Sequence, residues 1–145
     1  MDARAAEELL ARIERDARLL AQRFGLRYRA IEAERANVRR RYGVCFRDGT
    51  IRIRLRHAVS GRPLKYSSLV NTLCHELAHL RHFDHGLRFR AFYARILEYA
   101  RDRGIYRPAG RSPADLVLPA FGEPAPGRAR AVARASGPEQ LALFG

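Results

Sequence analysis

The sequence predicts a small α+β domain over residues 1–107, followed by a disordered tail over residues 108–145. Apolar residues recur at helical spacing near the N-terminus, an Asp-Gly pair separates two alternating apolar stretches, and two further helical patterns follow. Six of the seven prolines and five glycines then occur from Pro108 onward, which is typical of a disordered segment. At 145 residues, the chain has room for one small domain.

The first element is predicted to be an amphipathic helix over residues 3–24. Asp2 can cap its start, and Gly25 can end it in a left-handed conformation. A short strand over residues 26–31 is the next expected element. The apolar positions of the helix recur every three or four residues, with Arg and Glu between them, and they are Leu9, Leu10, Ile13, Ala17, Leu20 and Phe24.

A β-hairpin is expected around Asp48-Gly49, because this dipeptide favours a two-residue turn. Together with the preceding strand it would form a short antiparallel sheet. The turn would place the apolar residues of both strands on one face, through the pairs Phe46–Ile51, Val44–Ile53 and Tyr42–Leu55.

The other face of this hairpin is expected to be basic, with Arg41 opposite Arg56. Like charges opposite one another destabilise a hairpin, so the phosphates of DNA could compensate them. A solvent-facing surface of long, flexible arginines is an equally open alternative. The arginines on this face are Arg41, Arg47, Arg52, Arg54 and Arg56.

The next helix carries His75-Glu76-Leu77-Ala78-His79 and is expected to begin at a capping Ser67 or Ser68. His75 and His79 are four residues apart, so on a helix their imidazoles project from one face and can bind one metal ion. Glu76 follows the first histidine, where its carboxylate can take the proton of a water molecule activated by the metal. The pattern therefore predicts a hydrolytic zinc centre.

Three downstream residues are candidates for a third metal ligand: His82, His85 and Glu98. On a continuing helix His82 would lie about 10.5 Å along the axis from His75, which is too far for a tetrahedral site. His85 is favoured over Glu98, because the Asp and Gly that flank it tolerate the turn that would bring it back. Glu98 is then a solvated residue.

A last helix is expected over residues 87–103, with Gly104 as its stop. Its apolar residues recur at helical spacing and are expected to pack on the domain; they are Phe89, Phe92, Tyr93, Ile96 and Leu97.

The segment from His75 to Phe89, HELAHLRHFDHGLRF, resembles the active-site segment of the YgjP-like, WLM and SprT-like zinc metallopeptidases. Those families share an H-E-x-x-H-x5-H core followed by a small residue and a Phe. The resemblance covers about residues 40–100 and implies a zincin-like fold, with Zn²⁺ on His75, His79 and His85 and with Glu76 as catalytic base. Metzincins share the histidine spacing but need a Met-turn, and the only methionine here is Met1.

Composition favours a reducing compartment and a polyanionic partner. Cys45 and Cys74 form no C-x-x-C pair, and the sequence shows neither a signal-peptide pattern nor an apolar run of membrane length, so a cytoplasmic protein without a membrane partner is expected. Cys74 is expected to be buried. The net charge is +13, and about +12 of it lies before the tail, which holds four Arg and three acidic residues. Such an excess favours nucleic acid first and an anionic membrane second, so DNA and a place on the nucleoid are expected. A merely Arg-rich protein is the alternative.

The tail ends in Gln140-Leu141-Ala142-Leu143-Phe144, an apolar cluster on a Pro/Gly-rich tether. This segment resembles the bacterial sliding-clamp-binding motif Q-L-x-L-F. The resemblance implies docking on the DNA polymerase sliding clamp through Gln140, Leu141, Leu143 and Phe144. In the alternative, the segment folds back onto the domain as a short helix.

Two classes of function follow. The first is a DNA-associated metallopeptidase, recruited to the clamp and acting on proteins stalled on or crosslinked to DNA, as the SprT-like and WLM resemblance implies. The second is a non-catalytic clamp- or DNA-binding module with a structural zinc site, and a general cytosolic metallopeptidase is a further alternative. Glu76 favours the enzyme, because a structural site needs no base there. The oxyanion-stabilising side chain is left open among Tyr42, Tyr66, His82 and Tyr93.

Overall fold

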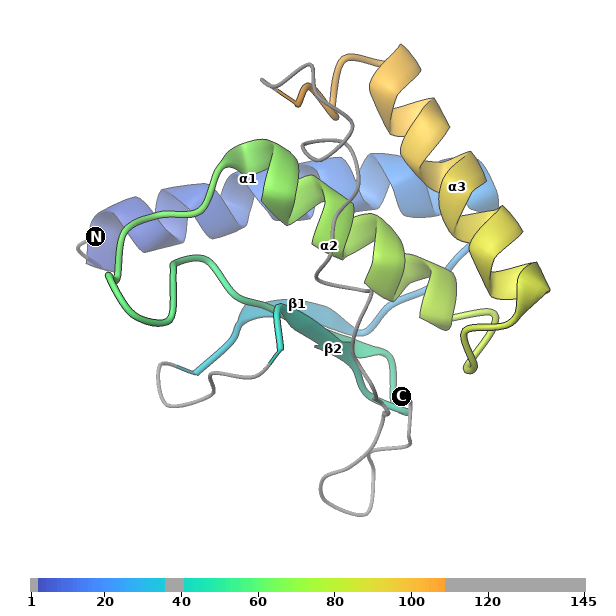
Figure 1. Ribbon diagram of the computed structural model, residues 1–145, viewed down its shortest axis with the longest axis horizontal. Coiled ribbons are helices and arrows are strands. Elements are labelled where there is room, and N and C mark those ends of the chain that lie inside the picture. Colours follow the sequence, from blue (N-terminus) through green and yellow to red (C-terminus); the bar gives the residue numbers. More distant parts are fainter. Residues whose placement is uncertain (1–2, 36–40, 109–145) are drawn as a thin grey trace.

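The computed structural model describes residues 3–35 and 41–108 as three helices that lie on one side of a small sheet (Figure 1). This arrangement confirms the predicted α+β fold class. Asp2 and the predicted tail with its clamp motif lie outside the described residues. The elements in chain order are α1 (Ala3–Phe24), β1 (Ala30–Ala33), β2 (Gly43–Cys45), β3 (Thr50–Ile53), α2 (Tyr66–His79) and α3 (Leu87–Asp102).

Helix α1 has the predicted bounds and ends as expected. Gly25 follows it with φ +67°, the left-handed conformation that glycine adopts at no steric cost. Its apolar face packs against α2, α3 and β1, which supports the predicted periodicity. Burial of each large side chain on that face contributes roughly 1.5–3 kcal/mol to stability. The buried residues of α1 are Ile13, Ala17, Leu20, Ala21 and Phe24.

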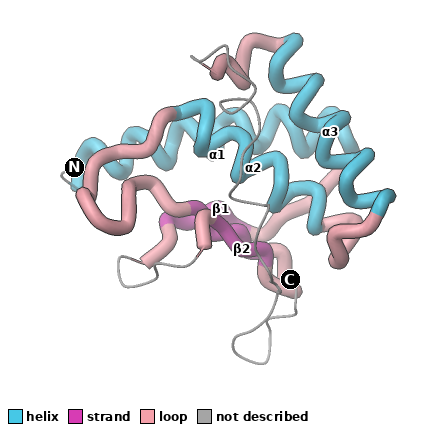
Figure 2. The backbone as a smooth tube through the Cα atoms, in the orientation of Figure 1, coloured by secondary structure: helices cyan, strands magenta, loops and turns pink. Residues whose placement is uncertain are grey.

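The sheet has the strand order β1-β3-β2 and is mixed. Figure 2 shows its strands in magenta below the cyan helices. Strands β2 and β3 are antiparallel, as predicted, whereas β1 pairs with β3 in parallel. The expectation of a wholly antiparallel sheet was therefore wrong, because the chain crosses from β1 to the far side of β3 before the hairpin begins. Strand β1 also begins later than the predicted range 26–31.

The predicted register of the hairpin is off by one residue. The observed pairs are Cys45 with Ile51 and Gly43 with Ile53. The Phe46 N–H donates to the Thr50 carbonyl at 2.8 Å and closes a three-residue loop in which Gly49 has φ +96°. A left-handed glycine at the end of such a loop is a common hairpin geometry. The shift also removes the predicted pairing of Arg41 with Arg56.

Helix α2 is the central helix and packs on β2 and β3, with α1 and α3 against it. It begins at Tyr66 after Lys65, and no side chain caps it, so the predicted caps Ser67 and Ser68 were wrong. Both serines lie inside the first turn, because the Lys65 carbonyl already accepts the N–H of Ser68 at 2.9 Å. The Tyr66 hydroxyl donates to Asp16 at 2.5 Å and joins the start of α2 to α1.

The chain turns back between α2 and α3, as predicted, in the segment over residues 80–86, which we call the elbow. Gly86 has φ −75°, so the turn does not use the left-handed conformation that glycine tolerates. Instead, Asp84 Oδ1 accepts the Gly86 N–H at 3.3 Å. The Arg81 guanidinium donates to the Phe24 carbonyl at 2.8 Å, which holds the elbow against the end of α1.

Candidate metal centre

Helix α2 and the elbow bring three histidines together. His75 and His79 lie one turn apart on α2, and His85 returns from the elbow so that its Nε2 is 3.1 Å from His79 Nε2. One potential ligand atom from each of the three lies within 4.8 Å of the others. Among the described residues, this is the group of His, Cys, Asp or Glu side chains that could hold a metal ion.

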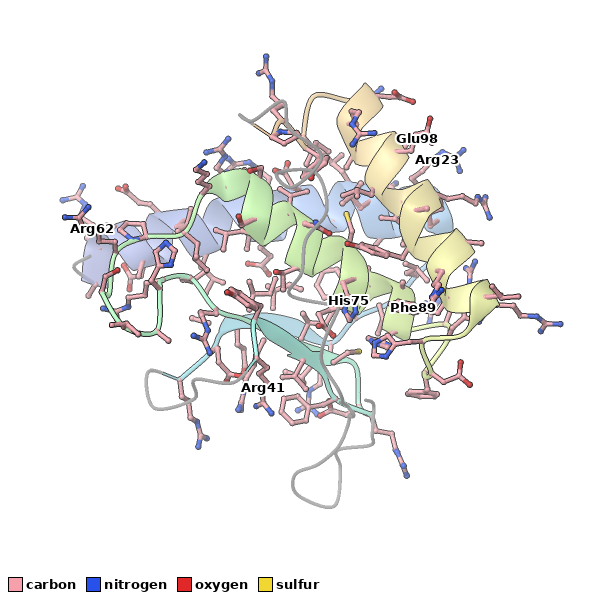
Figure 3. All side chains as sticks on the ribbon, viewed as in Figure 1. Arg23, Arg41, Arg62, His75, Phe89 and Glu98 are labelled. Atoms are coloured by element: carbon pink, nitrogen blue, oxygen red, sulfur yellow. The ribbon has the colours of Figure 1, made fainter. Side chains whose placement is uncertain are left out.

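The two competing candidates lie outside this cluster. Glu98 is exposed on α3, well away from His75 (Figure 3). The His82 ring lies edge-on to Phe92, with 5.8 Å between the ring centroids. The structure therefore places His85, and neither His82 nor Glu98, beside the helical pair.

The donor set suits a zinc ion. His79 Nδ1 lies 3.0 Å from the His82 carbonyl oxygen, so the tautomer that donates from Nδ1 leaves the Nε2 lone pair for a metal. Burial, together with the neighbouring His75 and His85, lowers the pKa of His79 to about 3. The ring is then neutral at pH 7, as a metal ligand must be. Three neutral imidazoles form a known catalytic zinc set, and the residues fit the ion.

Glu76 lies where α2 meets the edge strand β2. Its side chain is buried, and Oε2 is 3.2 Å from His75 Nδ1. Gly43 makes this approach possible, because a Cβ atom there would lie 3.1 Å from Glu76 Oε2 and only 2.6 Å from the Thr72 methyl carbon. Gly43 was not among the residues predicted for the site, although a glycine in a strand often marks a close approach.

Phe89 on α3 contacts all three histidine rings. Its ring stacks on His79, with 4.4 Å between centroids and 27° between planes. It lies edge-on to His75 at 5.0 Å and to His85 at 4.9 Å. Figure 3 shows Phe89 beside His75 between α2 and α3. The sequence predicted Phe89 to be a packing residue. The structure shows that Phe89 packs against the histidine cluster.

The four candidates for an oxyanion-stabilising residue differ in their surroundings. The Tyr66 hydroxyl donates to Asp16, and the Tyr93 hydroxyl donates to Asn71. Burial raises the pKa of both tyrosines. Tyr42, by contrast, is 42% exposed and adjoins Gly43 on the edge strand.

The predicted basic face is largely compensated inside the domain. Arg41 Nε lies 2.7 Å from Glu34 Oε2, and Arg52 Nε lies 3.0 Å from Glu32 Oε1. Arg54 is buried, and its Nε donates to the Arg41 carbonyl at 3.0 Å. The carboxylates come from Glu32 in the parallel strand β1 and from Glu34 just after it. A prediction made from the hairpin alone could not include them. External phosphates are therefore less necessary to compensate the arginines of this face than the hairpin alone predicted.

Two expectations from composition concern the cysteines and the membrane. Cys74 is buried, as predicted, and both it and Cys45 are free thiols. None of the helices in the described part of the chain is long and apolar enough to cross a membrane.

Comparison with known proteins agrees with this fold. Wss1 from Saccharomyces cerevisiae has a TM-score of 0.63 and 19% identity, over 71% of this chain and 84% of that chain. A Wss1 mutant gives the same TM-score and identity, over 72% and 87%. At this identity the likeness shows the fold alone. No curated protein sequence matches the chain at a significant level. The model of the WLM domain matches residues 2–107, so the chain belongs to the WLM domain family.

Proposed function

We propose that this protein is a zinc-dependent metallopeptidase that hydrolyses peptide bonds. The observation that carries the proposal is the cluster of His75, His79 and His85 with the carboxylate of Glu76 beside it, at the edge of a sheet. Zinc held there would lower the pKa of a water molecule and polarise a peptide carbonyl. Glu76 accepts the proton of that water and later donates it to the leaving amine.

The edge strand β2 offers a place for the substrate. The Tyr42 carbonyl accepts the N–H of Arg54, directly after β3, and the Phe46 N–H donates to the Thr50 carbonyl in β3. In an antiparallel ladder, residues alternate between bonding inward and facing outward, so Gly43 and Cys45 direct their backbone N–H and C=O groups away from β3. A peptide could add a strand on this edge by β-augmentation, and Gly43 would bring its backbone close to Glu76.

Metal removal tests the proposal directly. The purified protein should contain about one zinc per chain and should cleave casein. A chelator should abolish cleavage, and added Zn²⁺ should restore it, as followed by gel electrophoresis and elemental analysis. Undiminished cleavage by the zinc-free protein would rule out the metal mechanism. Zinc-loaded, folded protein that never cleaves would instead support a structural site.

A role on DNA is a further part of the proposal. This role rests on the net charge of +13 and on the resemblance to the SprT-like and WLM proteases. In this proposal the enzyme is located on the nucleoid and acts on proteins stalled on or crosslinked to DNA. Of the five arginines predicted to contact DNA, Arg47 and Arg56 are exposed. Those two are the best placed to reach phosphates.

Replacement of Arg47 and Arg56 by Gln should therefore flatten the salt dependence of duplex binding. Each lost phosphate contact lowers the log–log slope by about 0.9. Fluorescence anisotropy between about 50 and 200 mM salt would measure the slope. Over this range, six to ten phosphate contacts change the affinity for duplex DNA by roughly 10³–10⁵-fold. Arg23→Gln, at an exposed position on α1, is the matched control. An unchanged slope in the double variant would mean that both arginines are solvated surface residues that make no phosphate contact.

Recruitment to the sliding clamp is proposed from the tail sequence alone. A peptide of residues 136–145 should bind purified clamp, and Leu143→Ala with Phe144→Ala should abolish that binding, because both apolar anchors are lost. Zinc content and casein cleavage should stay unchanged in the full chain. If the full chain does not bind the clamp in a pull-down, or if truncation after Pro108 unfolds the domain, the tail has another role.

A further inference from the structure

A cavity of about 640 Å³ opens beside Tyr42, at the start of the edge strand. Its outer wall is the loop over residues 57–62, which is held at its base by the His57 N–H donating to the Arg62 carbonyl at 2.8 Å. None of the cluster histidines lines it. The lining residues are Tyr42, Arg54, His57, Ala58, Val59, Ser60 and Arg62.

The chemistry of this cavity favours an anionic group. Three of its described lining residues are basic and none is acidic. Arg62 and His57 are exposed, and the buried Arg54 has its guanidinium 5.4 Å from the centroid of the Tyr42 ring. A carboxylate can accept two parallel hydrogen bonds from one guanidinium, and such charge-assisted bonds are stronger than neutral ones. The cavity thus has the donors for one acidic side chain.

The cavity and the metal centre lie on opposite faces of the sheet at the same end of β2. The Cβ direction of Gly43 faces Thr72 and Glu76 on α2. Because side chains alternate along a strand, the Tyr42 side chain projects from the opposite face of the sheet, where the cavity lies. The side chains of a peptide added to the β2 edge alternate in the same way. A residue close to the cleaved bond would therefore direct its side chain toward Tyr42 and the basic lining.

We propose that this cavity is a specificity subsite that takes an acidic side chain of a peptide bound along the outer edge of β2. The inference rests on the proposed peptidase function and adds a substrate class to it. The enzyme then prefers peptides with Glu or Asp at one fixed position near the cleaved bond.

The test uses fluorogenic peptides that are identical except for Glu or Gln, placed in turn at each of four positions on either side of the cleaved bond. At one position, Glu should raise kcat/KM about tenfold over Gln, the effect of one good charge-assisted contact. Arg62→Glu should remove or invert this ratio, and Arg62→Gln should reduce it. Arg23→Glu makes the same charge change at the opposite end of the molecule and should keep the ratio (Figure 3).

A binding measurement separates this inference from the proposed function. Zinc-loaded Glu76→Gln protein should bind the Glu peptide more tightly than the Gln peptide, by anisotropy, and Arg62→Glu should abolish the difference. Equal kcat/KM at every position, with normal cleavage of the Gln peptides, would overturn the subsite and leave the peptidase intact. No hydrolysis at all would reject the peptidase, and the anisotropy would then decide the subsite. Arg62-dependent binding of a single-stranded oligonucleotide without any preference for the Glu peptide would also overturn it.

Discussion

Glu76→Gln is expected to abolish peptide hydrolysis while zinc stays bound. Glutamine keeps the size of the side chain, so it fits the narrow space beside Gly43. Its amide cannot accept a proton, and a positioned general base alone contributes about 10²–10⁴-fold to a rate. The loss in kcat on a fluorogenic peptide should therefore be at least that large, and elemental analysis should still find zinc.

The matched control is Glu98→Gln, because Glu98 is exposed on α3 and lies outside the histidine cluster. It makes the same chemical change, and it should leave kcat and zinc content unaltered. Turnover of Glu76→Gln within tenfold of the unchanged protein would contradict the assigned base. Loss of zinc together with activity would show that the carboxylate holds the histidines in place instead.

His85→Ala should release zinc, whereas His82→Ala and Glu98→Ala should retain it. Loss of a ligand costs more affinity than the 10–100-fold typical of a residue that only supports one. His85 is exposed, so its removal leaves no cavity in the core and the circular dichroism spectrum should not change. Competition with a chromogenic chelator would measure the affinities. If Glu98→Ala strips the metal and His85→Ala does not, Glu98 is the third ligand.

His82→Ala is an informative control because His79 Nδ1 lies 3.0 Å from the backbone carbonyl oxygen of His82. Alanine keeps that carbonyl, so the orientation of the His79 ring should survive the substitution. A large loss of zinc in this variant would mean that the His82 side chain itself takes part in the metal site.

The parts of the structure that depend on local spacing could be predicted from the sequence. The bounds of α1 and the stop of α3 near Gly104 follow from apolar periodicity and from glycines whose conformations are decided within a few residues. The turn before α3 was predicted from the Asp and Gly that flank His85, although Gly86 does not adopt a left-handed conformation. The grouping of His75, His79 and His85 was predicted in the same way, from helical spacing and a flexible break.

The parts that depend on distant segments could not be predicted. The register of the hairpin is decided by a three-residue loop and by the fit of Gly43 against Thr72 on α2, about thirty residues away along the sequence. The charge of Arg52 is compensated by Glu32 only because β1 pairs in parallel with β3, and no local sequence pattern predicts that pairing. The contacts of Phe89 with the histidines likewise arise only when α3 folds back.

The unequal exposure of the three histidines has a consequence for metal exchange. His75 and His79 are buried on α2, whose residues from Leu69 to His79 are all buried, while His85 is exposed on the elbow. Opening of a short connection costs much less free energy than unfolding of a core helix, so the ion can enter and leave without disrupting the domain. Bound zinc in turn stabilises the closed elbow in proportion to the logarithm of its free concentration. If the proposed zinc site forms, amide hydrogen exchange over residues 82–86 would thus follow the zinc supply, and the fraction of zinc-loaded protein would be set by the metal available to the cell.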